Sequence, residues 1–167
     1  MTSDWSYLPE PARGIAVATE AAVAAARDSD PEAYAEATER LAAHSAEQVG
    51  IVAGETVRLL LEDRYADGLT GDDLREVLVA CAAAATWYDD FDPNVATTLI
   101  AGALGVHEAD GERLPLTAAD MATHAPLLVA VLTAGPKPAK GRAGTTHPLP
   151  VYLRAALAEI ARTQTMD

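Results

Sequence analysis

Residues 127–132 read LLVAVL, and this short stretch indicates the fold more clearly than any other part of the chain. A helix drawn through it has apolar side chains on every side and no polar face to turn toward water. We therefore expect residues 117–134 to form a helix near the centre of the structure, with other helices packed around it. Thr117 and Asp120 have the spacing of a capping box at its start, and Pro126 interrupts it.

Helix-capping signals divide the rest of the chain into further helices. Asp30–Pro31 and Asp92–Pro93 each place a capping carboxylate before a proline that suits the first helical turn. No segment alternates apolar and polar residues for long enough to predict a strand. The expected fold is therefore all-α: a single domain in which about six helices form an irregular or orthogonal bundle. The expected helices cover residues 11–27, 31–65, 71 to about 85–88, 93–104, 117–134 and 151–163.

Two parts of the chain do not follow the helical pattern. Residues 1–10 form an N-terminal arm that precedes the helical domain of residues 11–167, and Trp5 and Tyr7 of this arm lie among polar residues. These rings are too apolar to stay in water, so they either dock on their own bundle or cover a neighbouring subunit, and both are candidate interface residues. Residues 135–147 are rich in glycine and proline, which predicts a mobile linker before the last helix.

The composition excludes several kinds of partner. The chain carries 25 acidic and 12 basic residues, a formal net charge of −13. Such an acidic surface repels nucleic acids and anionic membranes, and it favours a basic protein as a partner. Cys81 is the single cysteine, which excludes an internal disulfide. With no signal-peptide pattern at the N-terminus, we expect a cytoplasmic protein, and the alanine-rich composition is typical of bacteria with GC-rich genomes.

Residues 86–94 read TWYDDFDPN, where large aromatic residues meet three carboxylates. One interpretation is a corner between two helices, in which Trp87 anchors the turn in the core and Asp92 caps the next helix. The alternative is a cation site made by Asp89, Asp90 and Asp92, since hard cations prefer several oxygen ligands. No second acidic cluster at a recognisable spacing accompanies them, so we favour the corner.

Motifs for catalysis or metal binding are absent from the sequence. No two histidines lie three or four residues apart, so no helix presents a paired zinc site. Neither a GxSxG motif nor a phosphate-binding loop occurs. Cys81 lies on the apolar face of its helix, which indicates a packing residue with a raised pKa. We expect His124 to bond a carbonyl that Pro126 leaves free. The sequence thus predicts no catalytic residue, no metal and no cofactor.

Three hypotheses for function follow, in order of preference. The first is a non-catalytic interaction or assembly module that forms a homo-oligomer, most simply a homodimer. The second is a bundle that binds a small ligand near Trp87 and Tyr88, with Asp89, Asp90 and His124 as further lining residues; it requires a cavity of roughly 300 Å³ or more. The third is a metal-dependent enzyme that uses the three carboxylates of the corner, Asp89, Asp90 and Asp92. No motif is specific enough to place the chain in a family.

Overall fold

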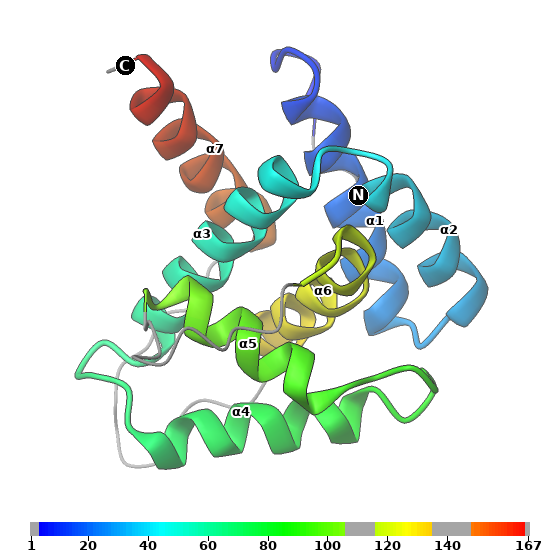
Figure 1. Cartoon of the computed structure of the whole chain (residues 1–167), viewed down its shortest axis with the longest axis vertical. Helices are drawn as coiled ribbons and strands as arrows, with labels where there is room; N and C mark the ends of the chain where they lie inside the picture. Colours follow the sequence, from blue (N-terminus) through cyan, green and yellow to red (C-terminus); the bar gives the residue numbers. More distant parts are fainter. Residues whose placement is uncertain (1–3, 106–115, 135–147, 166–167) are drawn as a thin grey trace.

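The computed structural model describes residues 4–105, 116–134 and 148–165. These residues form seven α-helices and no strand, which confirms the all-α prediction (Figure 1). The predicted linker at residues 135–147 lies outside the described residues. The helices are α1 (Ala12–Arg27), α2 (Pro31–Ala42), α3 (Ala46–Arg64), α4 (Gly71–Ala84), α5 (Pro93–Ala103), α6 (Ala118–Ala134) and α7 (Leu149–Thr165).

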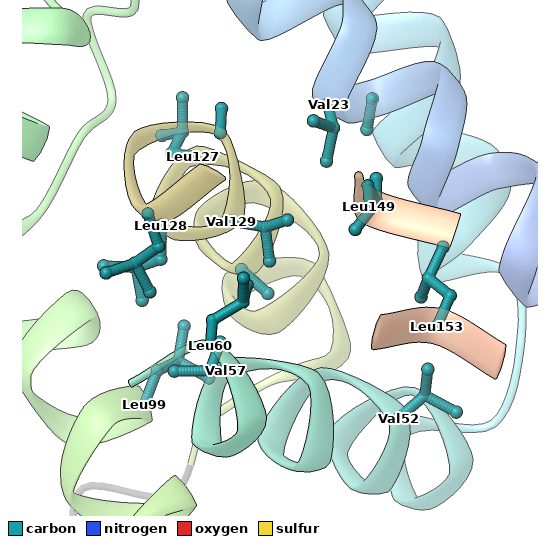
Figure 2. Close-up of a cluster of buried hydrophobic side chains, with 14 of the residues drawn as sticks. Val23, Val52, Val57, Leu60, Leu99, Leu127, Leu128, Val129, Leu149 and Leu153 are labelled. Atoms are coloured by element: carbon teal, nitrogen blue, oxygen red, sulfur yellow. The ribbon is translucent and has the colours of Figure 1, made fainter. Parts of the chain in front are cut away.

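The helix α6 forms the centre of the bundle. It packs against α1, α2, α3, α4 and α5. Leu128 and Leu132 are fully buried, and within the stretch LLVAVL only Val131 is half-exposed, so the predicted burial is confirmed. Figure 2 shows the surrounding core side chains, which come from four other helices: Val23 on α1, Val52, Val57 and Leu60 on α3, Leu99 on α5, and Leu149 and Leu153 on α7.

The single helix predicted over residues 31–65 is wrong, because this segment forms two helices, α2 and α3. Ser45 begins α3: its hydroxyl accepts the backbone N–H of Gln48 at 3.5 Å. Just before it, the N–H of His44 bonds the carbonyl of Leu41 in a tighter turn that ends α2. Ser45 and Gln48 have the spacing of a capping box, which is a signal for a helix start that the sequence itself contains.

A capping box begins α4, and the one predicted for α6 is present as well. The Thr70 N–H donates to the Asp73 carboxylate at 2.9 Å, and the Asp73 N–H donates to the Thr70 hydroxyl at 3.1 Å. Thr117 and Asp120 form the same reciprocal pair at 3.2 and 3.0 Å. Each pair satisfies N–H groups that have no partner within the helix, and so fixes where the helix begins.

The N-terminal arm packs on its own bundle through Trp5. This residue is 2% exposed, and its indole N–H donates to the carboxylate of Glu20 on α1. The guanidinium of Arg154, on α7, lies 5.6 Å from the centre of the indole ring. Tyr7 is 61% exposed by contrast. Of the two predicted interface residues, Tyr7 therefore remains on the surface, whereas Trp5 belongs to the core.

Candidate functional site

The corner after α4 is built from aromatic rings. Trp87 and Tyr88 pack edge-on against Tyr34 of α2, with ring centroids 5.1 and 5.5 Å away. The Tyr34 hydroxyl donates to the carbonyl of Thr123 on α6 at 2.5 Å. The indole nitrogen of Trp87 is buried without a hydrogen-bond partner in the described chain, so packing alone holds this ring. The corner thus ties the end of α4 to α2 and, through Tyr34, to α6.

His124 joins α6 to the start of α5. Its Nε2 accepts the backbone N–H of Asp92 at 3.0 Å, and its Nδ1 lies 3.0 Å from the carbonyl oxygen of Asp120. Because Nε2 accepts, Nδ1 must carry the hydrogen of the neutral ring. Burial lowers the pKa of His124, against the opposing effect of the carboxylates of Asp120, Asp92 and Asp90. The imidazole does bond a carbonyl, as expected. This carbonyl belongs to Asp120, however, and is not the one that Pro126 leaves free.

The three carboxylates of the corner differ in what they do. Asp92 caps α5, as predicted, because its Oδ1 accepts the N–H of Asn94 at 2.9 Å. Asp89 and Asp90 are exposed, and α4 ends at Ala84, so they stand clear of the negative end of that helix. Among the described residues, no three histidine, cysteine or acidic side chains lie close enough together to hold a metal ion. The hypothesis of a metal-dependent enzyme requires the carboxylates of Asp89, Asp90 and Asp92 to converge on one ion. The described residues show no such cluster.

Hollows of three kinds are lined by described residues. A void of about 10 Å³ lies in the core, a groove of about 220 Å³ lies beside the N-terminal arm, and a pocket of about 390 Å³ lies between α1 and α2. None of these three is lined by the residues that the sequence suggested for a ligand pocket: Trp87, Tyr88, Asp89, Asp90 and His124. Pocket formation at the corner stays a prediction, whereas the groove and the pocket are features of the structure.

The groove is apolar and lies between the arm, α1, α3 and α7. Its walls include Leu8 and Pro11 from the chain before α1, Ile51 on α3 and Leu157 on α7. Ile51 is 45% exposed. In Figure 1 the beginning of α1 and the end of α7 diverge above α3, while α4 lies at the opposite edge of the molecule. The groove and the aromatic corner are thus separate parts of the molecule.

Comparison with known proteins gives no relative for this chain: no protein-family model, no curated protein and no solved structure matches it. Within the described ranges, none of the helices has both the length and the apolar character needed to cross a membrane. Function is therefore inferred from the surface and the hollows of the chain itself.

Proposed function

We propose that the chain is a non-catalytic assembly module that forms a homodimer through the apolar groove beside its N-terminal arm. The observation that carries this proposal is an exposed tyrosine that directly precedes a residue lining an apolar hollow. Tyr7 is 61% exposed, and Leu8, the next residue, lines the groove of about 220 Å³. Large apolar side chains exposed around a hollow are typical of interaction surfaces, and tyrosine is enriched at the centres of interfaces.

A second copy of the chain is the occupant that charge favours. Two copies, each with a net charge of −13, repel each other unless they meet where neither carries many acids. Glu10 is the one charged residue among those that line the groove. A basic protein would instead bind most favourably to the acidic surface elsewhere on the molecule. The apolar groove offers it only one carboxylate, that of Glu10.

A two-fold dimer brings the same surface of both copies together. Tyr7 of one copy would then enter the groove of its partner, and the partner's Tyr7 would do the same in return. Stable interfaces bury about 1,200–2,000 Å² in total, so the groove forms the centre of the contact and its surroundings the rest. Ile51 lines the groove and is 45% exposed, so its side chain would lie at the centre of the contact.

Light scattering over a range of protein concentrations tests the proposal. The full chain is expected to have twice the mass of a single copy. Ile51→Glu places a carboxylate in both grooves of the dimer and is expected to give monomers. Val79→Glu is the matched control, because it adds the same charge at a residue of α4 that is 64% exposed. It is expected to leave the dimer intact, and melting curves of both variants check that they fold.

Two results would overturn the proposal. A full chain that is monomeric at every concentration excludes self-association. Dissociation by Val79→Glu, with Ile51→Glu still dimeric, would place the interface on α4. Point substitutions are preferable to removal of the arm, since Trp5 is buried and its loss would open the core.

A further inference from the structure

A charged pocket of about 390 Å³ lies on the side of α1 that faces α2. The two helices form an antiparallel pair, so the beginning of α1 stands beside the end of α2 (Figure 1). The first turns of α1 contribute Arg13 and Gly14, and the end of α2 and the turn after it contribute Arg40 and His44. In a chain with 25 acids and 12 bases, this concentration of cationic and hydrogen-donating groups in one hollow is unexpected.

The donors of this pocket are largely unused. No hydrogen bond or ion pair joins the Arg40 guanidinium or the His44 imidazole to another described residue. The Nε–H of Arg13 donates to the carbonyl of Leu8 at 3.0 Å and lies 3.9 Å from the carboxylate of Glu10, which leaves its two terminal amino groups free. Two arginines elsewhere have carboxylate partners: Arg58 pairs with Glu55 and Glu62, and Arg75 pairs with Asp72.

Gly14 brings the imidazole into the pocket. A Cβ atom at this position would lie 2.7 Å from Cε1 and 2.9 Å from Nε2 of His44, which is closer than real Cβ atoms approach. Glycine is a poor residue for a helix, but here it allows the ring to lie directly against the first turn of α1. The N–H of Gly14 already donates to the Glu10 carboxylate at 3.2 Å, so the pocket depends on side chains and not on a free helix terminus.

We infer that this pocket binds a small organic anion through a carboxylate or phosphate group. Guanidinium groups offer paired N–H donors that match the oxygens of both groups, so Arg13 and Arg40 would hold the anion, with His44 as a third ligand. Val17, which is 44% exposed, and Ala18 form an apolar wall for the carbon part of the molecule. A volume of about 390 Å³ lies in the range of small-molecule sites.

Charge limits the class of ligand further. The two guanidinium groups and the carboxylate of Glu10 leave one positive charge in the pocket. An anionic group with one or two negative charges fits this balance, whereas a polyanion would be repelled by Glu10 and by the net charge of −13 on the whole chain. Glu10 lines both this pocket and the groove proposed for the dimer, but every residue that lines the pocket belongs to one copy, so the site is complete without a partner.

Titration with anions tests the inference. Inorganic phosphate and acetate are added separately to the full chain, with chloride at equal ionic strength as the reference, and backbone amide shifts are followed by NMR. Saturable shifts at Gly14, Val17 and His44 are expected with at least one of the two anions. Phosphate alone would assign a phosphate-bearing ligand, and acetate alone a carboxylate.

Two variants and one control locate the binding. Arg40→Gln removes an exposed charge and is expected to raise the dissociation constant about tenfold, the factor that corresponds to the usual free energy of a hydrogen bond to a charged group. Gly14→Ala is expected to weaken it by displacing His44 while leaving all charges in place. Arg75→Gln is the matched control, because the Arg75 side chain is 79% exposed on α4. Shifts no larger than those with chloride, or an equal loss in Arg75→Gln, would overturn the inference.

Discussion

The helices α6 and α4 are both apolar along most of their length, but only α6 is buried. Every residue from His124 to Ala130 is buried in α6. In α4, Val77 and Cys81 are the buried residues, and Val79 is 64% exposed. Figure 1 shows α6 enclosed by other helices, whereas α4 lies along the edge of the bundle.

Charged residues account for the difference between the two helices: α4 carries Asp72, Asp73, Arg75 and Glu76, whereas Asp120 is the single charged residue of α6. Four of the nine apolar residues of α4 are alanines, and those at residues 82–84 are exposed. The free energy gained by burial is about 25 cal/mol for each Å² of apolar surface, so an alanine left in water forfeits much less than a leucine. Apolar composition alone therefore does not identify the core: α6 is buried along a stretch that no charged residue interrupts, at residues 124–130.

The largest expected effect tests this contrast directly. Leu128 is fully buried in α6, so Leu128→Ala should lower the free energy of unfolding by about 3–5 kcal/mol. Leu78→Ala makes the same chemical change in α4 at a half-buried residue and should cost less than half as much. Urea unfolding followed by circular dichroism measures both. Equal losses would show that α4 contributes to the core as much as α6 does.

The next effect concerns how α4 is held although it buries few residues. Trp87 follows α4 and packs on the buried ring of Tyr34, so Trp87→Ala should cost about 2–4 kcal/mol, less than for a fully buried tryptophan. Trp87→Phe keeps a ring in place and should recover much of this loss in the same urea experiment. A cost within about 0.5 kcal/mol, as for a surface substitution, would show that the corner does not anchor α4.

A smaller effect is expected for the cap of α5. Asp92→Ala removes the acceptor for the N–H of Asn94 and should cost about 0.5–2 kcal/mol in a melting experiment. Asp89→Asn is the control and should change stability by less than about 0.5 kcal/mol, because this residue is exposed. A rise of melting temperature with Mg²⁺ that disappears in Asp90→Asn would contradict the interpretation as a corner and restore the metal site.

Acid should weaken the joint between α6 and α5. Burial lowers the pKa of His124, so below the ordinary histidine pKa of about 6.5 the unfolded chain binds a proton that the folded chain does not. The free energy of unfolding therefore falls as the pH drops from about 6.5 to the lower pKa of the folded state, and this contribution is constant below it. Unfolding at several pH values should show a smaller decrease in His124→Gln. The same decrease in both proteins would assign the effect to other groups.

The smallest effect is expected on the outer face of α4. Val79→Ser replaces a side chain that is 64% exposed and should change the free energy of unfolding by less than about 0.5 kcal/mol. The comparison is made at concentrations where the protein is monomeric. A large loss there would mean that Val79 contributes to the packing of the bundle although its side chain is exposed, and would weaken the contrast between α4 and α6.

Local signals in the sequence predicted much of the fold. The caps at Thr70, Asp92 and Thr117 each involve residues two or three positions apart, so their chemistry is visible in the sequence. Cys81 is buried, and burial raises the pKa of its thiol to about 12, as its place on an apolar face suggested. The division at Ser45 was missed although the signal is of the same local kind.

Contacts between distant residues were beyond reach of the sequence. Phe91 stacks on the ring of His124 with centroids 5.8 Å apart, and Tyr34 reaches α6, but nothing in the spacing of these residues indicates the pairing. Arg13 and Arg40 share a pocket because α1 and α2 run in opposite directions, which depends on how two helices pack. Helical periodicity shows which face is apolar, and it does not show which helix covers that face.

The bond from the Asp92 N–H to Nε2 of His124 gives a residue on the surface a protected amide proton. The residue before a helix normally leaves its N–H to solvent, where deuterium replaces hydrogen at the rate of an open chain. At Asp92 that replacement must wait until the start of α5 separates from α6. The exchange rate of this one amide would therefore measure the free energy of opening the corner, apart from that of unfolding the whole bundle.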